Sequence, residues 1–73
     1  MIYQRSFAPD ADARDAIVYC DGNDVAVAGG VGSVLNDDSV VEKTYPYGPN
    51  GWYGRLDDEE AIRVYVICMV IPG

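Results

Sequence analysis

"IRVYVICMVI" occupies residues 62–71 and is the stretch that decides the fold class. Apolar and β-branched residues dominate it, and Arg63 is its only charged residue. Successive side chains of a β-strand point to opposite faces. One face is expected to enter the core, and it consists of Ile62, Val64, Val66, Cys68 and Val70. The other face becomes apolar toward its C-terminal end, which predicts that this end is covered on both faces.

Four shorter strands are expected before this stretch, each bounded by turn-forming residues. They are predicted at residues 16–20, 25–29, 39–47 and 52–56. "DGND" at 21–24 predicts a turn that closes a hairpin over residues 16–29, and "GPNG" at 48–51 predicts a second tight turn. The "NDD" loop at 36–38 and the acidic "DDEE" at 57–60 supply the remaining connections. About five short strands at regular spacing indicate an all-β fold, a small antiparallel β-sandwich or barrel.

Residues 1–15 are expected to form an extended N-terminal arm, and residues 16–73 a single β domain. Pro9 and the "DADARD" run after it oppose a regular strand in the arm. The alanine-rich "APDADARDA" at 8–16 also allows a short helix. Ile2, Tyr3 and Phe7 are apolar side chains that the domain or a neighbouring subunit must cover. These three residues are therefore candidate partner contacts.

The chain is strongly acidic: 12 Asp and Glu against 5 Lys and Arg give a formal net charge of −7. The cations are scattered, so we expect no nucleic-acid partner. The longest apolar run is far shorter than the roughly 18 residues that a membrane helix needs. The N-terminal segment also lacks the apolar core of a signal peptide. We therefore expect no membrane association and no signal peptide.

The two cysteines, Cys20 and Cys68, are the next candidates for a structural role. They form either a disulfide or two buried free thiols. A domain this small usually needs a cross-link, a metal or a partner subunit, which favours the disulfide. Without histidine, two cysteines leave a zinc site short of ligands, and the acidic turns do not match a twelve-residue calcium loop. We expect no metal and no cofactor.

"VAVAGGVGSVL" at residues 25–35 looks like the start of a nucleotide-binding loop. Leu35 stands where the dinucleotide fingerprint needs its third glycine, and no lysine follows as in a Walker loop. We expect Gly29, Gly30 and Gly32 instead to allow a β-bulge or the close passage of one backbone beside another. Because the chain has no histidine as general base and no visible activator for its serines, we expect no enzymatic activity.

"TYPYGPNGWYG" at residues 44–54 gathers four aromatic residues around one Pro/Gly turn. Exposed together, these rings would form a patch suited to carbohydrate or protein contact. Tyr45, Tyr47 and Tyr53 are therefore candidate partner-binding residues. A small core needs one large side chain, which favours a buried Trp52 with the tyrosines packed around the turn.

These features together resemble a small two-cysteine β module of secreted actinobacterial proteins and phage virion proteins. The resemblance rests on a strand ending in Cys20, the glycine pair, "YPYGPNGW" and "VYVIC", and it covers about two thirds of the chain. It implies that Cys20 and Cys68 form a bridge. It also implies structural roles for Gly29 and Gly30 and for the buried pair Gly51 and Trp52. Asp21 replaces the module's usual proline, and Val31 replaces its third consecutive glycine.

The resemblance implies a non-enzymatic structural or assembly protein. The expected role is a phage virion component that decorates or cements a capsid or forms part of a fibre. Such a protein would be made in the host cytoplasm and oxidised in the released particle. Its partners would be protein subunits of a larger assembly, with a homo-oligomer expected. The alternatives are a recognition module that holds a surface glycan or a protein on the aromatic loop 45–53, and a small inhibitor of a basic host protein.

Overall fold

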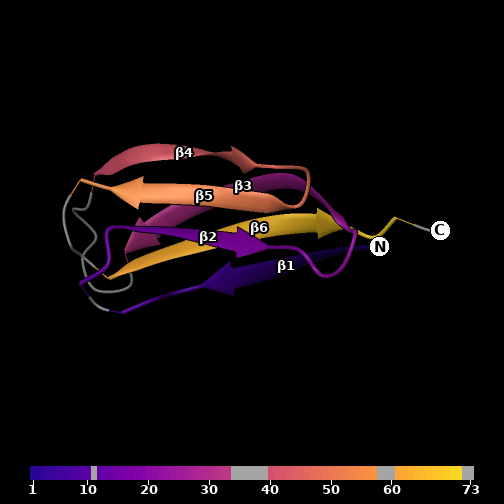
Figure 1. The fold of residues 1–73 in the computed structure, drawn as a ribbon, viewed down its shortest axis with the longest axis horizontal. Coiled ribbons are helices and arrows are strands. Elements are labelled where there is room, and N and C mark those ends of the chain that lie inside the picture. Colours follow the sequence, from indigo (N-terminus) through magenta and orange to yellow (C-terminus); the bar gives the residue numbers. More distant parts are fainter. Residues whose placement is uncertain (11, 34–39, 58–60, 72–73) are drawn as a thin grey trace.

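The computed structural model of the chain is described for residues 1–10, 12–33, 40–57 and 61–71. In these residues six antiparallel strands form two three-stranded sheets (Figure 1). The strands are β1 (Ile2–Phe7), β2 (Asp15–Tyr19), β3 (Val25–Ser33), β4 (Val41–Tyr47), β5 (Gly51–Leu56) and β6 (Ile62–Met69). The predicted all-β fold, a small antiparallel sandwich, is confirmed.

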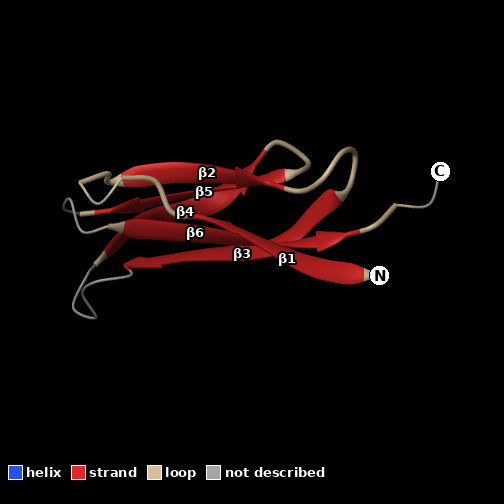
Figure 2. Ribbon diagram, turned by 90° about the horizontal axis from the view of Figure 1, so that it is seen from below, coloured by secondary structure: helices blue, strands red, loops and turns tan. Residues whose placement is uncertain are grey.

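Sheet A has the strand order β1-β6-β3, and sheet B has the order β2-β5-β4. Figure 2 shows the two sheets as stacked layers. Successive strands alternate between the sheets, except for β4 and β5, which are neighbours in sheet B. Tyr47 pairs with Gly51 across the predicted turn, where Gly48 has a φ of 68°. The predicted loop at 36–38, Ser39 and most of the predicted turn at 57–60 lie outside the described residues.

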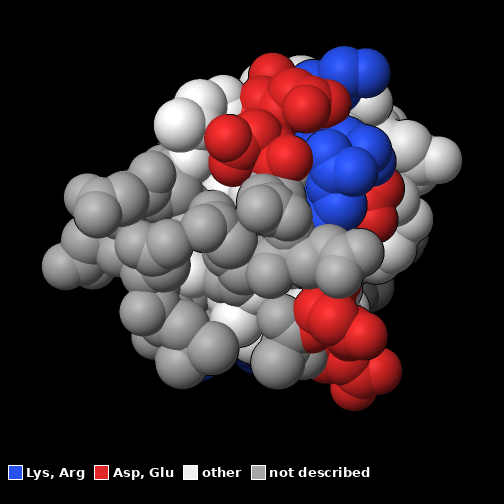
Figure 3. Space-filling model, turned by 90° about the vertical axis from the view of Figure 1, so that its left-hand side faces the viewer, with Lys and Arg blue, Asp and Glu red and all other residues white. Residues whose placement is uncertain are grey.

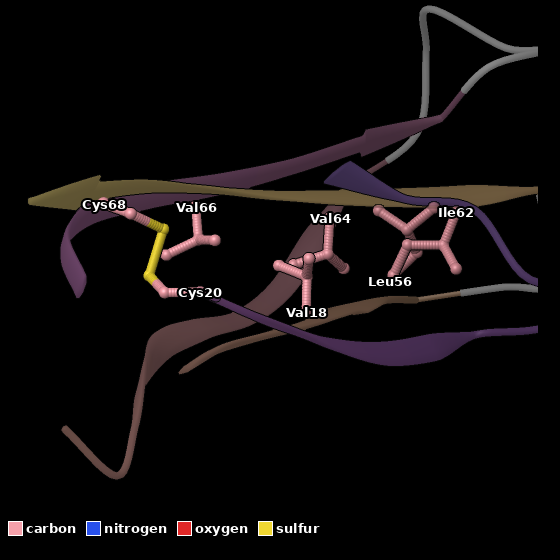
Figure 4. Packing of buried hydrophobic residues seen from close by; sticks show 7 residues of the cluster. All are labelled: Val18, Cys20, Leu56, Ile62, Val64, Val66 and Cys68. Carbon is pink, nitrogen blue, oxygen red and sulfur yellow. A yellow bond between two sulfur atoms is a disulfide. The ribbon is translucent and has the colours of Figure 1, made fainter. Parts of the chain in front are cut away.

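The core lies between β6 and sheet B, as the alternation in β6 predicted. Its fully buried side chains are Leu56, Ile62, Val64, Val66 and Cys68 (Figure 4). Val70, which we expected on the same inner face, lies beyond the end of β6 and is 36% exposed. On the other face Met69 and Ile71 are also exposed, so the expected cover on both faces is wrong for this chain.

Residues 2–7 form a regular strand instead of the expected arm. β1 pairs with β6 along its whole length, from Ile2 opposite Met69 to Phe7 opposite Val64. Pro9 lies after the end of β1, so it breaks no hydrogen bond of the β1–β6 ladder and does not oppose a strand at residues 2–7. The segment expected to be an arm therefore forms β1, one strand more than the five that were expected.

The expected hairpin over residues 16–29 is wrong as well. β2 belongs to sheet B and β3 to sheet A, so residues 21–24 carry the chain from one layer to the other. The turn itself forms: the Asp24 N–H donates to the Asp21 carbonyl at 3.0 Å, and Gly22 has a φ of 51°. An Asp-Gly turn thus reverses the chain without deciding which strands pair.

Cys20 and Cys68 form a disulfide, as the size of the domain and the resemblance predicted. Cys20 follows β2 of sheet B, and Cys68 lies on the inner face of β6 in sheet A. The bond therefore joins the two layers at one end of the core (Figure 4).

The glycines of β3 allow aromatic side chains, not a second backbone, to approach closely. A Cβ on Gly29 would overlap the indole of Trp52, and a Cβ on Gly30 would overlap the phenol of Tyr65. The two glycines face opposite sides of sheet A because they are adjacent in the strand. The expected β-bulge lies earlier in β3, between residues 26 and 28.

Trp52 packs against the core from β5 but is only partly buried, so it is not the centre of the core. Its indole N–H donates to the Thr44 hydroxyl at 2.7 Å. Its neighbour Gly51 is buried, and a Cβ there would lie 2.7 Å from the Tyr47 carbonyl and 3.0 Å from the Tyr19 ring. Gly51 was expected to have a structural role, and in the structure its missing side chain leaves room for the Tyr19 ring.

Reducing the disulfide should lower the free energy of unfolding by about 4 kcal/mol, because the bond restricts a long loop of the unfolded chain. That is comparable to the whole stability expected of so small a domain. Urea unfolding with and without dithiothreitol measures the difference. The double variant Cys20→Ala/Cys68→Ala is the control and should not respond to reductant. An unchanged midpoint after complete reduction of the native chain would contradict the expectation.

Gly29→Ala should destabilise the fold by about 1–3 kcal/mol, because the added methyl overlaps Trp52 in a packed interior. Gly32→Ala is the matched control: it lies in the same strand, and a Cβ there meets nothing within 4 Å. Thermal unfolding followed by tryptophan fluorescence compares the two variants. Equal losses in both would mean that Trp52 does not lie over Gly29.

Candidate functional site

The outer face of sheet B carries an aromatic surface. Val18 and Leu56 point into the core, so alternate residues of β2 and β5 point outward. The pairing of β4 with β5 extends the same face over a third strand. We call this surface the tyrosine face, and its members are Ile17, Tyr19, Tyr45, Tyr47 and Tyr53.

The rings of the tyrosine face meet across the strands. Tyr45 and Tyr53 are opposite one another, with ring centroids 5.0 Å apart and planes inclined at 40°. Such cross-strand aromatic pairs contribute to sheet stability. Gly51 separates Tyr47 from Tyr19 in the register, and its missing side chain makes room for the Tyr19 ring. Tyr19, Tyr45 and Tyr47 remain 51%, 45% and 46% exposed, so three rings are open to a partner.

Charged residues border the tyrosine face where β2 begins and β5 ends. The Arg55 Nε donates to Glu42 Oε1 at 2.9 Å, and its Nη1 lies 3.4 Å from Asp15 Oδ2. Arg14 lies 3.9 Å from the Glu42 carboxylate. Figure 3 shows acidic and basic side chains in contact at this end. With Lys43 opposite Arg55, the border carries no net negative charge, unlike the chain as a whole.

Tyr53 connects the aromatic and charged parts of the surface. Its hydroxyl donates to Asp15 Oδ2 at 3.0 Å. Burial and, next, this hydrogen bond to a carboxylate raise the pKa of Tyr53 above its ordinary value, because both disfavour the phenolate. Tyr53 therefore helps to fix the position of β2 beside β5, while Tyr45 and Tyr47 keep their rings exposed.

Tyr3, an expected partner contact, has its hydroxyl occupied within the chain. The hydroxyl donates to Asp24 Oδ2 at 2.5 Å and accepts from the Asp21 N–H at 2.9 Å. The Arg5 guanidinium lies 4.6 Å from the centroid of the Tyr3 ring and forms two hydrogen bonds with the Asp21 carboxylate. These contacts tie β1 to the turn between β2 and β3, which gives Tyr3 a structural role.

The other two residues of the expected arm lie apart from each other. Ile2 is 65% exposed and sits opposite Met69 on the outer face of sheet A. Phe7 is 50% exposed and lines a pocket between β1 and β2. Ile2, Tyr3 and Phe7 therefore do not form one contact surface.

The structure brings Tyr45, Tyr47 and Tyr53 together, as expected, and turns Trp52 to the inner face. Sequence reasoning missed Ile17 and Tyr19. Their alternation with buried Val18 could have placed them outward. Only the pairing of β2 with β5, which no local pattern specifies, puts them beside Tyr53.

In the described part of the chain, no three His, Cys, Asp or Glu side chains are arranged to hold a metal ion. No helix among the described residues is long and apolar enough to cross a membrane. No protein-family model matches the sequence, and neither curated proteins nor solved structures give a match. Evidence on function therefore comes from the surfaces of the chain itself.

Stability should fall above about pH 10 in part through Tyr53. Because the pKa of Tyr53 is raised in the folded chain, the folded state holds the phenolic proton more tightly than the unfolded state does. This contribution is complete below the unfolded-state pKa and is lost as the pH rises through the folded-state pKa. Tyr53→Phe, which cannot ionise, should therefore lose less stability than the native chain as the pH is raised. Urea midpoints from about pH 9.5 to 11 test this, and parallel losses in both proteins would contradict it.

Proposed function

We propose that the protein is a non-enzymatic structural subunit, a phage virion component that decorates or cements a capsid or forms part of a fibre. It docks on neighbouring subunits through the tyrosine face. The observation that carries the proposal is this face, on which three tyrosine rings from two strands stay open. Tyrosine is enriched in protein interfaces because its rigid ring buries a large area at a small cost in conformational entropy.

The charge distribution supports contact between copies of the chain at the tyrosine face. Each copy carries a formal charge of −7, so copies repel one another wherever acidic surfaces meet. At the border of the tyrosine face, Asp15 and Glu42 are paired with arginines, which reduces this repulsion there. The disulfide supports an oxidising location such as the outside of a released particle.

Glycan recognition on the same face is the second candidate. It is favoured by the way Tyr45 and Tyr47 expose their rings on one face of β4, on which Lys43 lies two residues from Tyr45. An amphipathic ring of this kind suits a ligand with both apolar and hydroxylated surfaces. The two candidates differ in the ligand and share the residues.

Tyr45→Ala/Tyr47→Ala should weaken self-association at least about 30-fold, the ratio that corresponds to 2 kcal/mol. Native mass spectrometry and sedimentation equilibrium over a concentration series measure the dissociation constant. The native chain should form an oligomer in these experiments. Mass spectrometry of gradient-purified particles should also detect the chain at a fixed ratio to the major capsid protein.

Tyr65→Ala is the matched control, since Tyr65 is 38% exposed and belongs to the other sheet. If this variant dissociates the oligomer while the double variant does not, the contact lies on sheet A and the proposal is wrong. If the native chain is monomeric at every concentration, contact between copies is excluded. Binding on a glycan array that is lost in the double variant would then establish the second candidate.

A further inference from the structure

Two strand edges lie without a partner on the same side of the sandwich. In the described residues β1 pairs only with β6, and β2 pairs only with β5. Figure 1 shows β1 and β2 running next to each other along this side, one in each sheet. An unpaired edge presents main-chain N–H and C=O groups that can accept another strand.

The register identifies the main-chain groups on the free edge of β2. The Cys20 N–H donates to the Asn50 carbonyl at 2.7 Å, so these two residues form a hydrogen-bonded pair in line with the β2–β5 ladder. Bonded and non-bonded pairs alternate along an antiparallel ladder. The even-numbered residues of β2 therefore bond to β5. Ile17 and Tyr19 direct their N–H and C=O groups to the free edge.

A pocket of about 280 Å³ separates the two edges, which we call the β1–β2 slot. It is lined by Arg5, Ser6, Phe7, Ile17, Val18 and Tyr19. Three consecutive residues of a strand cannot all point their side chains into one pocket, so the main chain of both strands forms part of its wall. Phe7 and Tyr19 are each about half exposed beside it. The slot thus combines free main-chain groups with apolar side chains.

We propose that the β1–β2 slot binds an extended segment of a partner protein, which adds to β2 as a fourth strand of sheet B. Strand addition obtains affinity from main-chain hydrogen bonds and specificity from pockets for alternate side chains. Ile17 and Tyr19 supply the hydrogen bonds, and the slot beside Phe7 receives apolar side chains of the partner. This site goes beyond the proposed function, since it needs neither Tyr45 nor Tyr47.

The charge of the chain favours a basic partner segment. Asp15 and Asp21 flank the strand but are paired with Arg55 and Arg5. The attraction therefore comes from the net charge of the chain and from Asp10, which precedes the strand. The cation in the slot, Arg5, is already paired with Asp21. With a formal net charge of −7, the chain attracts a segment with lysine or arginine at its solvent-facing positions.

The probe is a blocked decapeptide of alternating valine and lysine, and its control has glutamate in place of lysine. Amide hydrogen exchange is measured by NMR on the native, disulfide-bonded chain. The Val/Lys peptide should slow exchange at Ile17 and Tyr19 at least about tenfold, and its affinity should fall with added salt. Unchanged exchange at both amides at millimolar peptide would overturn the proposal. Equal binding of the Val/Glu peptide would overturn the assignment of a basic partner.

Ile17→Pro removes an N–H from the free edge of β2 without removing a bond of the β2–β5 ladder. It should weaken binding of the Val/Lys peptide at least about tenfold. Ile17→Val, which keeps the N–H and a branched apolar side chain, should bind like the native chain. Circular dichroism and intact mass confirm that each variant is folded and oxidised.

Gln4→Pro is the matched control on β1, because the slot is lined by other residues of this strand. The Val70 N–H donates to the Met1 carbonyl at 2.9 Å, so the even-numbered residues of β1 face its free edge. Gln4→Pro should bind the peptide normally, and loss of binding here but not in Ile17→Pro would place the added strand on β1 and overturn the proposal. The Tyr45→Ala/Tyr47→Ala chain should still bind the peptide, which separates the failure of this inference from that of the proposed function.

Discussion

The contact between the inner face of β6 and sheet B is the interaction on which the rest of the structure depends. β6 is the central strand of sheet A, and four of its side chains are completely buried. Leu56 packs near one end of this contact, and the disulfide between Cys20 and Cys68 closes the other (Figure 4). The core contains aliphatic side chains and no fully buried aromatic ring. So small a core gives a thin margin of stability, and the covalent bond between the layers compensates for it.

The narrow separation of the sheets also explains where the aromatic residues lie. A Cβ on Gly54 would come within 2.7 Å of Val31 in the opposite sheet, so the layers approach closely at the middle of the sandwich. Trp52 enters from the inner side over the bare backbone of Gly29, and Tyr3 packs against the core from the edge strand β1. Both rings are only partly buried. Tyr19, Tyr45, Tyr47 and Tyr53 lie on the outer face of sheet B, where a thin core places no limit on ring size.

The sequence predicts what depends on local patterns and fails where distant strands choose partners. The alternation in β6 identified its buried side chains from Ile62 to Cys68, and the Pro/Gly turn identified the β4–β5 connection. The pairing of residues 2–7 with β6 and the separation of β2 from β3 are long-range choices, which turn residues do not encode. The three tyrosines around the predicted turn were found because they are close in sequence. Tyr19 joins them only through the β2–β5 register.

β2 serves two surfaces at once because of the geometry of an edge strand. At Ile17 and Tyr19 the side chains point outward to the tyrosine face, while the main-chain groups of the same residues point to the β1–β2 slot. Side-chain substitutions on β4 and proline substitutions on β2 therefore act on different surfaces. A fourth strand added beside β2 would also widen the outer face of sheet B next to Tyr19. A partner strand bound at the slot would then adjoin any subunit docked on the face, so the two contacts would reinforce each other in one assembly.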